Sequence, residues 1–329
     1  MLKSKFMLTF LLLNLIISGC SADSRETFID EPGLKVVTTI YPVQDIIENL
    51  GGDLITTDHI LPAGASPHTY EPTVEQARLI SDADLFVYIG AGLDEWAVSM
   101  AQTAGTSLVL IDLSAEVNLL EAASNHLHES DEDTDHECTD EYEGEEGILN
   151  DCEHEHGPVD PHFWLDPLLI RDHVSPAITS ALIELAPENR TAFEQYLVDY
   201  QGELGQLHED IELGLSSITD NKFISFHSAW RYFAERYNLK EVAVIAYFPG
   251  QEPSAGWLAG LVGLIETEGI NAIFAEPQFP TALADRIAEE SGVDVLLLDP
   301  IGSDNVEGKD NYISLMRYNL EIMIEGLAQ

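Results

Sequence analysis

The chain has 329 residues, of which 59 are acidic and 14 are basic, so its formal net charge is −45 at pH 7. A surface this negative repels phosphate backbones and anionic lipid headgroups, which argues against nucleic acid as a partner. It attracts metal cations, although solubility or a salty habitat would equally explain most of the charge. With 45 % hydrophobic residues, the chain can bury a sizeable core and is expected to form two domains.

The amino-terminal residues have the pattern of an export signal. Lys3 and Lys5 precede an apolar run at residues 6–17, and small residues stand immediately before Cys20. A small-residue pair followed by cysteine resembles the lipobox of bacterial lipoproteins, in which the cysteine carries lipid. We therefore expect residues 1–20 to be a lipoprotein signal peptide, Cys20 to be the lipid attachment site and residues 21–33 to be a flexible tether. An ordinary secretion signal with an incidental cysteine is the alternative.

Strand and helix patterns alternate through residues 34–165. We expect strands at 35–40, 54–60, 85–89 and 108–111, with helices at 43–50 and 73–81. Strands separated by helices favour right-handed crossovers and a parallel sheet. This region is therefore predicted to be an amino-terminal α/β lobe.

An unusual segment at residues 125–157 interrupts this lobe. It contains fourteen Asp or Glu residues and no Lys or Arg, and dense like charge with few apolar residues predicts a disordered loop. Its five histidines are candidate auxiliary metal ligands: His126, His128, His136, His154 and His156. Cys138 and Cys152 would form a disulfide in an oxidising compartment, or would join the imidazoles in a soft-metal cluster.

Helical apolar spacing dominates residues 166–185 and 187–216, with a break near Pro187. Residues 188–329 are predicted to form a carboxy-terminal lobe, in which the alternation of strands and helices returns after the helical stretch. Its expected strands lie at 223–226, 241–246, 272–275 and 293–298, and its last helix at 312–327. The predicted fold class is α/β, with two lobes that each hold a four-stranded parallel sheet flanked by helices.

Three isolated histidines lie where strands or apolar segments give way to turns: His68, His162 and His227. Glu276 and Asp299 likewise follow predicted strands directly. Open α/β sheets bind ligands outside the carboxyl ends of their strands, so two facing lobes would bring these side chains together. Three imidazoles and one carboxylate make a nearly complete tetrahedral zinc shell. The sequence therefore predicts a transition-metal site.

Several motifs in the same order resemble the zinc-binding branch of the metal-specific solute-binding proteins of ABC importers, the cluster A-I family. They are GASPHTYEP at residues 64–72, DPHFWLDP at 160–167, FH at 226–227 and FAEPQF at 274–279. The resemblance covers residues 34–329. It implies two lobes joined by one long rigid helix, placed here at residues 166–187, with the metal held between the lobes.

The same resemblance implies that the ligands are His68, His162, His227 and Asp299, with Glu276 orienting an imidazole. Glu276 or a water molecule remains an alternative fourth ligand. An imidazole at position 227 favours Zn²⁺ over Mn²⁺, because carboxylates suit manganese and imidazoles suit zinc or copper. The acidic insertion matches the place of a histidine-bearing loop in this family, but its excess of carboxylates and its two cysteines depart from the usual pattern.

The function expected from these features is zinc capture outside the cytoplasm and delivery to an ABC permease and its ATPase, by a monomer held to the membrane through lipid. A manganese-specific binding protein, a surface zinc buffer or adhesin, and a zinc hydrolase are the alternatives. The sequence lacks His-Glu-x-x-His, Gly-x-Ser-x-Gly and Walker phosphate-loop motifs, so it gives no support to an enzyme.

Overall fold

The computed structural model describes residues 33–103, 107–122, 159–246 and 253–328. The predicted signal peptide, the tether up to residue 32, the acidic segment at 125–157 and the sites assigned to them lie outside these residues. In the described part of the chain, none of the helices combines the length and the apolar composition needed to cross a membrane.

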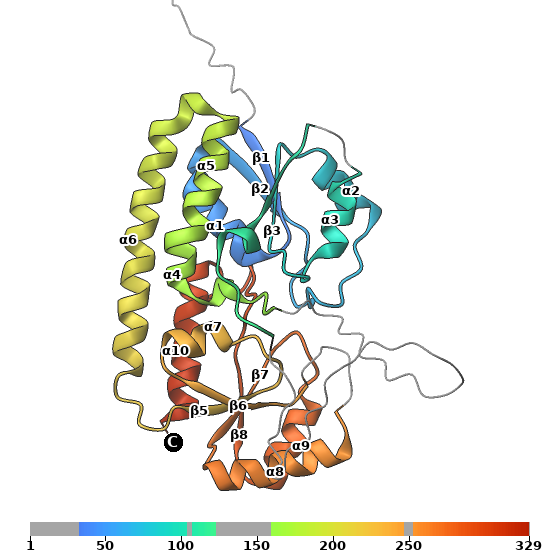
Figure 1. Ribbon diagram of the computed structural model, residues 1–329, viewed down its shortest axis with the longest axis vertical. Helices are drawn as coiled ribbons and strands as arrows, with labels where there is room; N and C mark the ends of the chain where they lie inside the picture. The colour runs from blue at the N-terminus through green and yellow to red at the C-terminus, as the bar shows by residue number, and fades with distance from the viewer. Residues whose placement is uncertain (1–32, 104–106, 123–158, 247–252, 329) are drawn as a thin grey trace, which may run out of the picture. The chain divides into compact units, whose positions relative to one another are not determined.

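Two four-stranded parallel sheets organise the described residues, as predicted (Figure 1). The first has the order β2-β1-β3-β4 and the second the order β6-β5-β7-β8. The strands of the first sheet are β1 (Leu34–Thr38), β2 (Ile55–His59), β3 (Leu85–Tyr88) and β4 (Val109–Asp112). Those of the second sheet are β5 (Lys222–Ser225), β6 (Lys240–Val244), β7 (Ala272–Ala275) and β8 (Asp294–Leu297).

Helices follow most strands and cover both sheets, because a parallel sheet must bury both of its faces. In the first half they are α1 (Tyr41–Gly51), α2 (Val74–Ser81) and α3 (Glu95–Ala101). In the second half they are α7 (Arg231–Arg236), α8 (Ala255–Glu268), α9 (Ala282–Ser291) and α10 (Tyr312–Leu327). Successive residues of β1 point to opposite faces of the sheet. Val36 packs with α1 on one face, and Val37 packs with α2 and α3 on the other. This alternation is the two-residue period of a strand.

The long helix lies later in the chain than predicted. Within residues 166–187 the chain is helical from Pro167 to Leu185, with α4 (Pro167–Leu169), a π-helical turn (Ile170–Val174) and α5 (Ser175–Leu185) in direct succession. Pro187 ends this run, because proline cannot continue a helix that precedes it. The longest helix is α6 (Arg190–Leu215), with 26 residues. The longest helix therefore lies after residues 166–187 rather than within them, and the domain limits stay a prediction.

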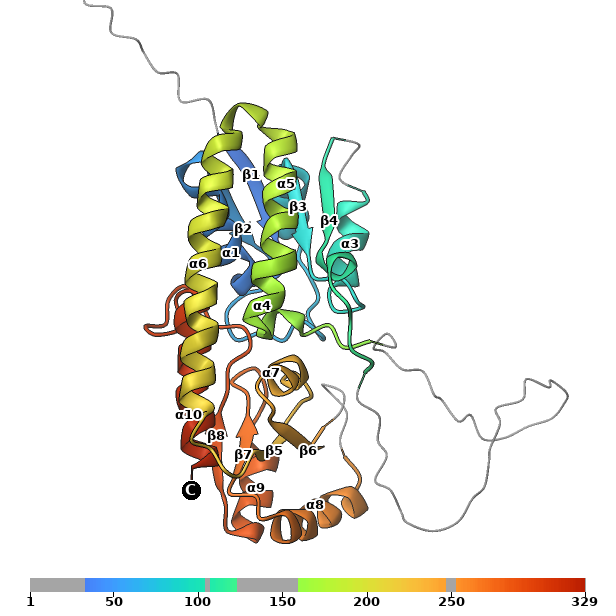
Figure 2. The same cartoon turned by 60° about the vertical axis from the view of Figure 1, so that its left-hand side comes forward.

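Both halves of the molecule pack against α6. It contacts α1 and α5 near its start and α10 near its end, and Figures 1 and 2 show it passing beside both sheets. Its buried side chains recur every three to seven residues along one face: Phe193, Tyr200, Leu204, Leu207, Ile211 and Leu215. A single helix bound to both cores restricts how far the halves can separate.

Hydrogen bonds also join the two halves close to the predicted site. The indole Nε1 of Trp164 donates to the carbonyl of Pro300 at 2.8 Å, and the hydroxyl of Tyr312 donates to the carbonyl of Trp164 at 2.7 Å. The carboxylate of Asp45 on α1 accepts the Tyr312 backbone N–H at the start of α10 at 2.9 Å. All four residues are buried, so each bond is shielded from competition by water.

Candidate metal centre

Three histidines from three separate segments converge on one point. His68 lies on the loop between β2 and α2, His162 stands immediately before a 3₁₀ turn at Phe163–Leu165, and His227 follows β5. One ring nitrogen from each lies within 4.8 Å of the others. The Nε2 atoms of His68 and His162 are 3.2 Å apart. Tetrahedral zinc with bonds of about 2.0–2.1 Å would hold two nitrogens about 3.4 Å apart, so the spacing of the His68 and His162 nitrogens suits such an ion.

His162 is oriented by a carboxylate two residues earlier in the chain. The Oδ1 atom of Asp160 accepts the backbone N–H of His162 at 2.9 Å and contacts its Nδ1 at 2.8 Å. A proton on Nδ1 leaves the lone pair of Nε2 free to face the other histidines. Burial lowers the pKa of His162 despite the opposing effect of Asp160, so this imidazole is neutral near pH 7.

Glu276, at the end of β7, contacts the outer nitrogen of His227. The Nδ1 atom of His227 lies 3.2 Å and 3.3 Å from the two carboxylate oxygens, and both side chains are buried. Burial alone would lower the pKa of His227, but the charge and hydrogen bond of Glu276, with the charge of Asp160, raise that pKa overall. This arrangement agrees with the predicted orienting role of Glu276, which stays a prediction.

Neighbouring aromatic and amide groups fix the His68 loop. Trp96 on α3 donates its indole N–H to the carbonyl of Pro67 at 3.0 Å, and its ring meets that of Tyr70 edge to face. The side chain of Gln76 donates to the Tyr70 hydroxyl at 2.6 Å and to the Ile60 carbonyl at 2.7 Å. The loop is therefore held from both sides of His68.

Asp299 does not join the three histidines in this structure. Among the described residues, the group able to hold a metal contains His68, His162 and His227 without it. Its Oδ1 accepts the Gln278 amide at 2.9 Å and the backbone N–H groups of Ile301 and Gly302 at 3.2 and 3.0 Å. Its Oδ2 pairs with the Lys309 ammonium at 3.1 Å. Because these donors occupy the carboxylate, its assignment as the fourth ligand remains a prediction.

The hollow beside the three histidines is small. Its volume is about 10 Å³, which is about the space that one water molecule needs. Five apolar side chains line it together with the histidines and Glu276: Pro67, Trp164, Phe279, Pro300 and Ile301. Enzyme pockets for small molecules typically measure about 300–1,000 Å³. The hollow beside the histidines is far smaller than such pockets and is close to the size of a single ion or water molecule.

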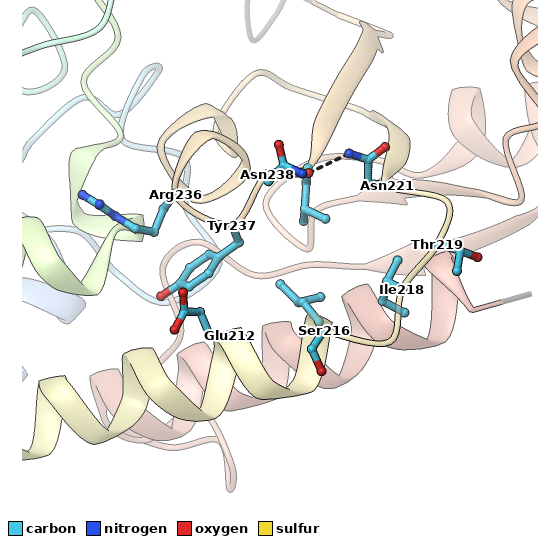
Figure 3. A pocket seen from close by; sticks show the side chains of 10 residues that line it. Glu212, Ser216, Ile218, Thr219, Asn221, Arg236, Tyr237 and Asn238 are labelled. Atoms are coloured by element: carbon cyan, nitrogen blue, oxygen red, sulfur yellow. Dashed lines mark hydrogen bonds between the residues drawn. The ribbon is translucent and has the colours of Figure 1, made fainter.

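A larger hollow of about 430 Å³ lies near the carboxyl end of α6 (Figure 3). Its walls include Glu212, Arg236 and Tyr237, and the Asn221 amide donates to the Asn238 carbonyl at its rim. None of the three converging histidines lines it. The size of a hollow therefore does not identify the metal site here.

Comparison with known proteins identifies the family. The family described as "Zinc-uptake complex component A periplasmic" matches residues 36–326. The chain belongs to this family. The resemblance predicted from the histidine motifs is thus confirmed, and the family consists of metal-binding transport proteins rather than enzymes.

Several relatives are similar over most of this chain. It is 31 % identical to the zinc-binding lipoprotein AdcA of Streptococcus pneumoniae, over 88 % of this chain but only 55 % of AdcA, so it spans about half the length of that relative. It is 30 % identical to the high-affinity zinc uptake system protein ZnuA of Bacillus subtilis, covering 95 % of this chain and 94 % of ZnuA. The manganese-binding lipoprotein MntA of Halalkalibacterium halodurans is 26 % identical over the full length of both.

A solved crystal structure of ZnuA has the same fold. It superposes with a TM-score of 0.73 at 29 % identity, covering 89 % of this chain and 99 % of that one. The predicted architecture of two four-stranded parallel sheets with a long helix is therefore confirmed.

Asp160 is the site residue that the sequence interpretation missed. The signal was present as the spacing Asp160-Pro161-His162, which lets the carboxylate reach both the backbone N–H and the ring Nδ1 atom of His162. We expect Asp160→Ala to weaken zinc binding by about 10- to 100-fold, as losses of such orienting partners usually do. Asp160→Asn keeps an acceptor and should weaken it less. Calorimetric titration of both variants checks this; equal affinity of Asp160→Ala and the unaltered protein would contradict it.

Proposed function

We propose that this chain is an extracytoplasmic solute-binding protein that captures zinc between its two lobes and hands the ion to an ABC-type permease. The observation that carries the proposal is the convergence of three imidazole nitrogens at a hollow with room for a single ion. The names of its AdcA and ZnuA relatives support it. The domain limits remain part of the proposal, with residues 34–165 and 188–329 as the two metal-binding lobes.

Zinc is the proposed cargo because the converging ligands are nitrogen atoms. Imidazole suits zinc, whereas manganese prefers carboxylate and carbonyl oxygens. The manganese-binding relative MntA keeps manganese as the second candidate. We propose His68, His162 and His227 as ligands, with Asp299 completing the shell once it is released from Lys309. Glu276 and water are the alternative fourth ligands.

Capture needs no covalent chemistry. Zinc entering the hollow would exchange its water for the imidazole nitrogens, and any imidazolium proton would leave as the ion binds. The apolar walls exclude water and strengthen the electrostatic attraction between the ion and its ligands. Because α6 packs on both halves, release at the permease requires only small shifts of the lobes rather than a wide hinge.

The remaining parts of the proposal concern residues outside the described structure. Cys20 would carry the lipid anchor, and residues 21–33 would tether the folded part to the membrane. The five histidines of residues 125–157 would collect zinc near the site, while Cys138 and Cys152 form a disulfide or contribute thiolates. A cognate permease with its ATPase is the proposed partner of a monomer without enzymatic activity.

Metal analysis tests this proposal. The protein, stripped of metal and then loaded, is expected to retain one zinc per chain in the presence of excess manganese. A variant lacking residues 125–157 separates the central site from the acidic segment and should retain that zinc. Retention of manganese in place of zinc would favour the MntA-like alternative, and retention of neither metal would overturn the proposal.

A further inference from the structure

Lys309 lies where it can compete with a metal ion. It belongs to the segment between β8 and α10, and its ammonium is 3.1 Å from the Oδ2 atom of Asp299. The Lys309 side chain is 16 % exposed and that of Asp299 is 8 % exposed. The ammonium also lies over the Tyr318 ring, 4.2 Å from its centre. This ion pair is thus largely shielded from water.

The paired carboxylate adjoins the histidine hollow. Pro300, Ile301 and Gln278 line that hollow, and all three are either next to Asp299 in the chain or contact it directly. Three donors fix Oδ1, whereas Lys309 is the partner of Oδ2 that a cation could replace. A zinc ion and an ammonium cannot both take the same position on one carboxylate oxygen, because their charges repel.

The backbone of Lys309 is held in place, which leaves the side chain as the part that can move. Its carbonyl accepts the Ser303 N–H at 3.2 Å, and its N–H donates to the Val306 carbonyl at 2.9 Å. Gly302 has a φ of +67°, and a Cβ at that position would lie 2.8 Å from the Lys309 carbonyl oxygen. The close approach therefore requires glycine. The neighbouring Asp310 carbonyl accepts the Tyr41 hydroxyl from α1 at 2.6 Å, which anchors the segment further.

We propose that Lys309 is an internal competitor for the captured cation. In the empty protein its ammonium occupies Asp299 and compensates the charge of this buried carboxylate. During loading the ammonium turns out to solvent, and Asp299 completes the shell. At the permease the ammonium returns to Asp299 and favours departure of the ion. Lys309 thereby lowers the affinity of the protein for zinc and raises the rate at which zinc dissociates. This inference rests on the proposed function, since it requires zinc at the three histidines.

The test is removal of the ammonium. Lys309→Met keeps most of the aliphatic side chain and is expected to bind zinc about tenfold more tightly, with slower release to a chelator in stopped-flow measurements. Lys309→Arg keeps the charge and should stay near the affinity of the unaltered protein. The matched control is Lys222→Met, which removes another lysine paired to a carboxylate at 3.1 Å, that of Glu268, at the amino end of β5. It should leave the affinity unchanged.

The same substitution in an Asp299→Asn background separates competition from a general charge effect. Competition for Asp299 predicts that Lys309→Met then gives little further gain. An equal gain in both backgrounds would show that only the long-range charge matters, and an unchanged or weaker affinity of Lys309→Met would also overturn the inference. Failure of the unaltered protein to bind zinc would instead overturn the proposed function. Melting temperatures of all variants identify any that do not fold.

Discussion

His162→Ala is expected to weaken zinc binding by about 10²- to 10³-fold. Structural zinc sites with four ligands bind with about 10–16 kcal/mol, so one ligand accounts for roughly 3 kcal/mol. His162 is buried at 4 % exposure, and its Nε2 lies 3.2 Å from that of His68. Its removal would also leave the buried carboxylate of Asp160 without the imidazole it orients. Isothermal titration with zinc, by competition with a chelator, measures the change.

His173→Ala is the matched control for this substitution. It removes an exposed imidazole in the π-helical turn at Ile170–Val174, away from the converging nitrogens, and should leave zinc affinity unaltered. Equal losses in the two variants would mean that zinc binds histidines without regard to the cluster. An unaltered zinc affinity of the His162→Ala variant would show that His162 is not a ligand.

Zinc affinity is expected to fall as the pH falls through the imidazole range, beginning above the ordinary histidine pKa. The reason is His227, whose pKa is raised overall because Glu276 outweighs the effect of burial. The empty site therefore binds a proton there that the loaded site must release. Affinity is at its full value above the raised pKa and is lost below it, by about one power of ten per pH unit for each competing proton.

His162 should contribute to this loss only at lower pH, because burial lowers its pKa. The number of protons released for each zinc ion bound is thus expected to rise above one as the pH falls. Calorimetry in buffers of different ionisation enthalpy counts the protons released at each pH. Glu276→Gln removes the charge that raises the His227 pKa, so the decline should begin at lower pH in this variant. An affinity independent of pH, with no proton released, would contradict the expectation.

Much of the fold could be predicted because its signals are local. The strand patterns around Val36, Phe86, Ile224 and Ile273 are short apolar runs between turn residues, and each falls on an observed strand. Alternation with helices then indicated parallel sheets. The long helix was misplaced because the apolar spacing of residues 166–185 and 190–215 is similar in sequence. Packing against both cores distinguishes α6 from the helical run before it.

The histidines of the site were predictable because strand ends in parallel sheets are ligand positions. His227 follows β5 and Glu276 follows β7, so their proximity depends only on sheet order. The contact of Asp160 with His162 was missed although the two residues are only two positions apart in the chain. The pairing of Lys309 with Asp299 could not be foreseen, because it depends on the path of an irregular segment between β8 and α10.

A crystal grown with zinc, measured on both sides of the zinc absorption edge, tests the proposed site most directly. We expect one anomalous peak bonded at about 2.0–2.1 Å to nitrogen atoms of His68, His162 and His227. The Lys309 ammonium is expected to have left Asp299 in that crystal. A peak elsewhere on the chain, or three histidines with no ion between them at saturating zinc, would contradict the proposal.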